Sequence, residues 1–152
     1  MKLYFFRHGE ADWPNWNKPD DERPLTKAGA KEVRKVAKLL SQLKVAPLIL
    51  TSPLPRASQT ATIAAEVLGV EMREENNLKP GFNVVRLARL LQEFSGRDLM
   101  VVGHEPDFSH AIQKLTGGAI KLSKAGIALV DLDESSMSGR LRWLLPPKIA
   151  LT

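Results

Sequence analysis

Four side chains suited to phosphate chemistry each follow a short apolar run of the chain. They are Arg7, His8, Arg56 and His104. A neutral imidazole can attack phosphorus and carry the phosphoryl group as a covalent intermediate. Guanidinium groups pair with phosphate oxygens in bidentate geometry and keep their charge at any relevant pH. These residue types, in similar positions along the chain, predict one anion pocket able to transfer a phosphoryl group.

Each of these residues has an expected role in the pocket. His8 would be the nucleophile, and Gly9 would leave room for a bulky anion because glycine has no Cβ. Arg7 and Arg56 would clamp the phosphate, Arg56 near the first turn of a helix whose free N–H groups also favour an anion. His104 would donate a hydrogen bond to a phosphoryl oxygen or carry charge as imidazolium. Taken alone, either histidine could be a structural residue bonded to the backbone, and either arginine could belong to a surface ion pair.

Strand-like and helix-like segments alternate along the chain. Strands are expected at 3–6, 47–51, 71–74, 99–102, 126–132 and 141–145, the last two joined by a polar turn at 135–139 and antiparallel. Helices are expected from the N-cap Thr26 to Leu43, and at 57–68, 84–94 and 106–115. This alternation predicts an α/β fold with a mostly parallel sheet. Ligands bind at the carboxyl ends of such strands, where all four side chains fall.

Length and composition narrow the class of protein. The 152 residues fit a single domain spanning 1–152, and a hydrophobic share of 43% is ordinary for a soluble globular protein. The net charge of +5 is only a weak indication of an acidic partner or substrate. The absence of cysteine excludes disulfides, thiolate metal sites and cysteine nucleophiles. With no long apolar segment, no histidine pair at metal-binding spacing and no nucleic-acid motif, we expect a cytoplasmic enzyme without membrane, metal or nucleic-acid contacts.

Three motifs resemble the histidine phosphatase superfamily, and most closely its small branch, the SixA-type protein phosphohistidine phosphatases. They are Arg7-His8-Gly9-Glu10, the segment 51–61 (TSPLPRASQTA) and Val102-Gly103-His104-Glu105-Pro106. Arg23-Pro24-Leu25-Thr26, followed by Gly29, matches a further element of that family, and the likeness extends over about residues 1–115. The resemblance implies a three-layer α/β/α sandwich, with His8 accepting the phosphoryl group amid Arg7, Arg56 and His104. It implies no metal and no organic cofactor.

One expected feature of the larger relatives is missing. Mutases and ester phosphatases of the family place an acid after a leucine, but here the matching stretch 76–81 reads NNLKPG. An alkoxide leaving group needs a proton, because its conjugate acid has a pKa of about 15.7. The imidazole of phosphohistidine needs that proton much less, because its conjugate acid has a pKa of about 6.5. The gap favours P–N cleavage, although Glu10, Asp12 and Glu105 are possible substitute acids for P–O cleavage.

These observations predict a protein phosphohistidine phosphatase that works through a phosphohistidine intermediate on the enzyme. The expected partner is a phosphohistidine-bearing protein, and the chain is expected to be a monomer. Two alternatives stay open: a phosphomonoesterase acting on a small metabolite, and a catalytically silent phosphoprotein-binding module. Trp13 and Trp16, in the polar segment 11–21, either contact a protein substrate or cover the edge of the core.

Overall fold

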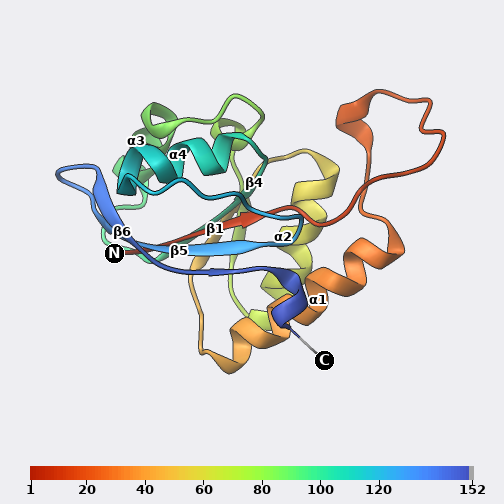
Figure 1. The fold of residues 1–152 in the computed structure, drawn as a ribbon, viewed down its shortest axis with the longest axis horizontal. Helices are drawn as coiled ribbons and strands as arrows, with labels where there is room; N and C mark the ends of the chain where they lie inside the picture. The colour runs from red at the N-terminus through yellow and green to blue at the C-terminus, as the bar shows by residue number, and fades with distance from the viewer. Residues whose placement is uncertain (151–152) are drawn as a thin grey trace.

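Six strands form one mixed sheet in the computed structural model, which describes residues 1–150 (Figure 1). In sheet order the strands are β3 (Met72–Glu74), β2 (Leu48–Thr51), β4 (Leu99–Gly103), β1 (Lys2–Arg7), β5 (Ile127–Asp133) and β6 (Ser138–Leu145). The pairings from β3 through β1 are parallel, and β5 and β6 run antiparallel at the other edge. The predicted mostly parallel mixed sheet is confirmed.

Helices cover both faces of this sheet. They are α1 (Lys27–Gln42), α2 (Pro55–Leu68), α3 (Val84–Glu93) and α4 (Asp107–Thr116), and short 3-10 turns lie at Asp20–Glu22, Asn76–Leu78 and Pro147–Ile149. Figure 1 shows α3 and α4 on one side of the sheet and α1 and α2 on the other. The expected three-layer α/β/α sandwich is therefore confirmed. Within residues 1–150, no helix is both long and apolar enough to span a lipid bilayer.

The central strands bury side chains on both faces. In β1, Leu3 and Phe5 join the core under α3 and α4, while Tyr4 and Phe6 join the core under α1 and α2. This division follows from the two-residue period of a strand. Burying a side chain of this size contributes roughly 1.5–3 kcal/mol, so the continuous apolar runs hold the strand ends in place.

The first helix begins where the sequence predicts it. Thr26 is the N-cap of α1, and its hydroxyl accepts the N–H of Gly29 at 3.0 Å. The backbone N–H of Thr26 also donates to the carbonyl of Glu10 at 3.0 Å. The start of α1 is thereby tied to the segment that follows β1.

Two element boundaries differ from the predicted ones by two residues or more, and the others agree to within one residue. Helix α2 begins at Pro55 rather than Ala57, because proline presets the helical φ angle and needs no N–H partner in the first turn. Strand β6 begins at Ser138 rather than Leu141. Backbone pairing with β5 continues past the apolar residues, since an edge strand does not require an apolar side chain at every position.

Gly29 offers a test of this packing. A Cβ at position 29 would lie 2.2 Å from the carbonyl oxygen of Glu10, a backbone atom that cannot turn away. Alanine normally stabilises a helix interior by roughly 0.5–1 kcal/mol over glycine. We expect Gly29→Ala instead to destabilise the protein by about 1–3 kcal/mol, as overpacking does.

Chemical denaturation measures this effect, with Ala28→Gly, at an exposed position of the same turn, as the matched comparison. Ala28→Gly should cost about 1 kcal/mol through helix propensity alone. A higher denaturation midpoint for Gly29→Ala would contradict the close approach of α1 to Glu10.

Candidate active site

Parallel strands bring the two histidines to one edge of the sheet. Arg7 of β1 pairs in register with Gly103 of β4, and the next residues along the two strands are His8 and His104. Their ring centroids lie 5.3 Å apart. Ser52, after β2, joins the same edge through its N–H, which donates to the carbonyl of Val102 at 2.9 Å. The three motifs that are distant in sequence therefore meet in space.

The His8 ring is held in one tautomer. Its Nδ1 lies 2.7 Å from the carbonyl oxygen of Gly9, which can only accept, so Nδ1 carries the hydrogen and Nε2 keeps a free lone pair. The side chain is only 9% exposed. Burial lowers the pKa of His8 to about 4 against the hydrogen bond to Gly9, and the charges of Arg56, Arg7 and Arg23 act in the same direction as burial. At neutral pH His8 is an uncharged imidazole with Nε2 available for attack.

His104 is also buried and neutral. Its Nε2 lies 2.9 Å from the hydroxyl of Ser52. Burial, then the neighbouring His8 and the charges of Arg56 and Arg7, lower the pKa of His104 to about 3. Among residues 1–150 its buried Nδ1 has no hydrogen-bond partner. Of the two predicted forms of His104, the neutral one is therefore favoured in the free site.

The two predicted phosphate clamps lie beside these histidines. Arg7 Nη1 donates to the carbonyl of Leu122 at 2.9 Å. Arg56, 6% exposed, donates from Nη1 to the carbonyl of Asp20 at 3.1 Å. The buried Nε of each arginine has no partner among residues 1–150. Both guanidinium charges lower the pKa of both histidines, which indicates that the arginines lie near the two rings. Their unpartnered Nε atoms are donors of the kind that a phosphoryl group would accept from.

Gly9 packs closely against α1. A Cβ at position 9 would lie 2.6 Å from a methyl group of Val33 and 3.2 Å from the carbonyl oxygen of Gly29. The N–H of Gly9 donates to Thr60 Oγ1 at 3.0 Å and is already used. The expectation that Gly9 also makes room for a phosphate stays a prediction. Its glycine character serves packing against α1, and its carbonyl orients His8.

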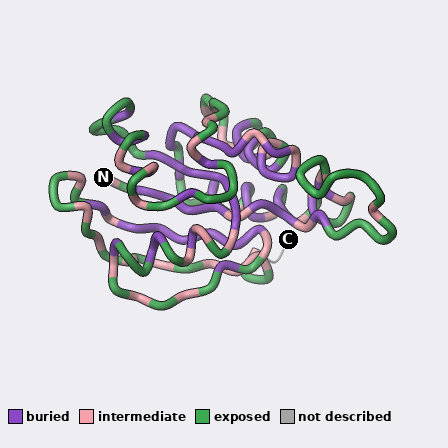
Figure 2. Tube along the Cα trace, turned by 90° about the horizontal axis from the view of Figure 1, so that it is seen from above, coloured by how far each residue is buried: buried purple, intermediate pink, exposed green. Residues whose placement is uncertain are grey.

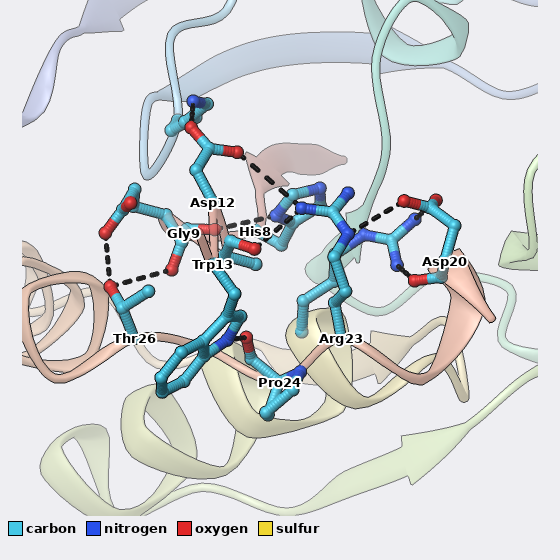
Figure 3. A network of polar contacts seen from close by, with 12 residues as sticks. His8, Gly9, Asp12, Trp13, Asp20, Arg23, Pro24 and Thr26 are labelled. Atoms are coloured by element: carbon cyan, nitrogen blue, oxygen red, sulfur yellow. Dashed lines mark hydrogen bonds and ion pairs between the residues drawn. The ribbon is translucent and has the colours of Figure 1, made fainter. Parts of the chain in front are cut away.

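Arg23 is a site residue that the sequence pattern did not single out. Figure 3 shows its guanidinium between the carboxylates of Asp12 and Asp20. Its Nε donates to Asp20 Oδ1 at 2.8 Å, and its Nη1 donates to the carbonyl of Ala11 at 2.6 Å. Its charge contributes to the lowered pKa of His8. The motif Arg23-Pro24-Leu25-Thr26 indicated the family, but it did not indicate that Arg23 lies near His8.

Two hydroxyl groups complete the support of the site. Ser52 holds His104, as described above, and the hydroxyl of Thr60 donates to the carbonyl of Arg56 at 2.7 Å while accepting the N–H of Gly9. Thr60 therefore ties the end of β1 to the first turns of α2. Both residues stand in the 51–61 motif, so their neighbourhood was indicated by sequence although their partners were not.

The candidate substitute acids are occupied elsewhere. Glu10 bonds the hydroxyl of Thr26 at the start of α1. Glu105 accepts the N–H of Ser109 at 2.7 Å in the first turns of α4. Asp12 pairs with Lys124, whose hydrogen bond lowers the pKa of Asp12. A carboxyl that donates a proton near neutral pH needs a raised pKa, so Asp12 does not fit that role, and the oxygens of Glu10 and Glu105 are engaged at the starts of α1 and α4.

The segment at the family's usual acid position also supplies no proton donor. Leu78 is fully buried, and Lys79 follows it on the surface. Burial raises the pKa of nearby Glu75, but its charged neighbours are Glu93 and Arg73 rather than residues of the site. Within residues 1–150, no three acidic, histidine or cysteine side chains are grouped as they would be around a metal ion.

Comparison with known proteins identifies the family of this chain. The model of the histidine phosphatase superfamily (branch 1) matches residues 3–80. An uncharacterized protein of Picosynechococcus is 39% identical over 137 residues, covering 84% of this chain and 82% of the relative. This chain belongs to the histidine phosphatase superfamily. The family indicated by the sequence motifs is confirmed, and it supports a hydrolase that acts on phosphate groups.

Two further relatives extend over nearly the whole chain. An uncharacterized chloroplastic protein of Arabidopsis thaliana is 29% identical over 169 residues, covering 98% of this chain and 77% of the relative. The protein histidine phosphatase SixA, in its structure complexed with tungstate, is 29% identical in sequence to this chain, and the two folds superpose with a TM-score of 0.88. That likeness covers 98% of this chain and 99% of SixA, so it includes all three site segments.

The lowered pKa values predict an unusual titration of this superfamily member. Free histidine is half protonated near pH 6.5, whereas His8 and His104 should stay neutral until the pH falls toward 4 and 3. The unfolded chain then binds protons before the folded one, so stability is full above about pH 6.5 and is lost as pH falls toward 4.

Histidine-detected NMR measures both titrations directly, because the chain has only three histidines and His110 can be assigned with a His110→Ala variant. Urea denaturation at several pH values measures the stability. A midpoint near 6.5 for either buried ring would contradict the described electrostatics.

Proposed function

We propose that this chain hydrolyses phosphohistidine on a protein, through a phosphoryl intermediate on His8. The observation that carries the proposal is the His8–Gly9 hydrogen bond, which leaves Nε2 unprotonated within a cluster of arginine charges. A binding module would need the arginines but not a nucleophile held in one tautomer. In SixA, whose fold this chain shares at 29% identity, the activity is that of a protein histidine phosphatase.

In the first step the His8 Nε2 lone pair attacks phosphorus in line with the substrate's P–N bond. That bond breaks, and its electron pair leaves with the substrate imidazole, which departs neutral because its other nitrogen carries a proton. Arg7, Arg56 and His104 would hold the phosphoryl oxygens during transfer, where positioned donors supply most of the acceleration. The Gly9 carbonyl stabilises the positive charge that develops on the His8 ring.

In the second step a water molecule attacks the phosphorus of phosphorylated His8. The Nε2–P bond breaks, its electrons return to Nε2, and inorganic phosphate leaves with the oxygen of water. The proton of the attacking water passes to a phosphate oxygen or to solvent. His8 leaves as a neutral imidazole with its Nδ1 hydrogen still on Gly9, so neither step requires an acid from the protein.

The preference for P–N over P–O bonds rests on the occupied carboxylates. Glu10 and Glu105 bond to the starts of α1 and α4, and Asp12 is held ionised by Lys124. A general acid contributes roughly 10²- to 10⁴-fold to reactions with poor leaving groups. An ester phosphatase built on this site would lose that factor, whereas a phosphohistidine phosphatase would not.

Replacement of His8 tests the covalent step. His8→Ala should abolish the acid-labile phosphoenzyme that forms with a radiolabelled phosphohistidine protein, because no other group in the site holds a free imidazole Nε2 oriented by a carbonyl. His110→Ala, on the exposed side of α4, is the matched control and should label like the unmodified chain. Turnover and labelling retained in His8→Ala would remove His8 from the mechanism.

The second test compares leaving groups. With peptides that differ only in phosphohistidine or phosphoserine, kcat/KM should favour phosphohistidine by at least about 10²-fold, the factor that a missing general acid would cost the ester. Phosphate release under the same buffer conditions gives both rates. Equal or faster release from phosphoserine would favour the phosphomonoesterase alternative.

A further inference from the structure

Two tryptophans lie side by side on the segment between β1 and α1. Pro14 and Asn15 form a turn in which Asn15 adopts φ 57°, a left-handed conformation that asparagine tolerates better than most residues. The turn brings the rings of Trp13 and Trp16 together, with centroids 6.5 Å apart. Figures 1 and 2 show this segment projecting from the body of the molecule, with most of its residues exposed.

The indole groups are anchored by their polar ends. Trp13 Nε1 donates to the carbonyl of Pro24 at 2.7 Å, and Trp16 Nε1 donates to the carbonyl of Pro19 at 3.0 Å. Trp13 nevertheless remains 39% exposed. Rings whose N–H groups are already bonded present apolar surface at little cost in conformational entropy.

These rings line a surface hollow of about 620 Å³ beside the phosphoryl site. Its lining residues are Asp12, Trp13, Pro14, Trp16, Lys18, Asp20 and Arg23. The hollow adjoins the site, because the carbonyl of its lining residue Asp20 accepts a hydrogen bond from Arg56 Nη1 at 3.1 Å. A group bound here would sit next to a phosphoryl group held by Arg56.

The charged groups of the hollow are largely paired with one another. The carboxylate of Asp20 lies 2.8 Å from Arg23 Nε and 3.7 Å from Arg56 Nη2. Asp12 pairs with Lys124 and lies 3.6 Å from Arg23 Nη1. Lys18 also lines the hollow and forms no ion pair among residues 1–150, so its ammonium group and the apolar faces of Trp13 and Trp16 are left to recognise a ligand.

We propose that this hollow, called here the tryptophan hollow, binds an apolar side chain that flanks phosphohistidine in the substrate polypeptide. The inference rests on the proposed function and narrows it to a phosphohistidine within a polypeptide carrying an apolar neighbour. Free phosphohistidine carries no flanking side chain that could fill the hollow. Aromatic side chains held rigid in this way act as interface anchors.

The test uses synthetic phosphohistidine peptides in which one leucine is placed in turn at each flanking position in an otherwise alanine background. At one or more positions leucine should raise kcat/KM relative to the all-alanine peptide. Trp13→Ala and Trp16→Ala should each reduce the ratio of kcat/KM for the leucine peptide to that for free phosphohistidine by about tenfold, the loss of one aromatic anchor. Trp143→Phe is the matched control and should keep that ratio, because Trp143 packs on Tyr4 from β6.

A binding measurement separates failure of this inference from failure of the proposed function. In the Trp143→Phe background, Trp13 and Trp16 are the remaining tryptophans, and their fluorescence should respond to a non-hydrolysable phosphohistidine-analogue peptide with leucine more strongly than to its alanine counterpart. Selective binding of the leucine peptide without turnover would contradict the proposed function but support the tryptophan hollow. Hydrolysis without any leucine preference, or with an unchanged ratio in both tryptophan variants, would overturn the tryptophan hollow alone.

Discussion

Positive charge held next to buried, uncharged imidazole is the constraint on which the site depends. The proposed attack on phosphorus would require a neutral His8, and the charges of Arg7 and Arg56 act with burial to lower its pKa. Arg7 is held by a backbone carbonyl rather than by a carboxylate, so its charge is not cancelled by its anchor. The same arginines that depress protonation of the histidines would stabilise the anionic substrate, and one arrangement thus serves both needs.

The sheet provides the rigidity that this arrangement requires. Repulsion between like charges would separate the arginines if their backbones were free to move. Arg7 ends β1, which is buried on both faces by two distinct cores, and Arg56 lies in α2, whose alanines pack into one of these cores. The parallel register of Arg7 with Gly103 places the following histidines at the same level. Hydrogen bonds then join the segments that carry the site. Ser52 bonds His104, and Thr60 bonds the backbone of both Gly9 and Arg56.

The α/β class and the parallel part of the sheet could be predicted from the sequence alone, as could the approach of His8 to His104 at the strand ends. Apolar runs and helical periodicity report burial, and burial is what places strand ends together. The role of Gly9 and the position of Arg23 could not be predicted in this way. Both depend on backbone carbonyls, those of Gly9 and Ala11, whose direction is set by folding and leaves no trace in residue type. The extra residues of β6 and of α2 were missed because neither is apolar at the positions concerned.

The bonds between Glu10 and Thr26 have a consequence for how such a protein could be re-engineered. They close the excursion from Ala11 to Leu25 at its neck, where the N–H of Thr26 meets the Glu10 carbonyl at 3.0 Å. A loop clamped at both ends transmits little of its own rearrangement to the scaffold, and long surface loops tolerate insertions at small entropic cost. The tip of this loop can therefore be lengthened, shortened or replaced without disturbing the hydrogen bond between His8 and Gly9, provided that Asp20 and Arg23 are retained.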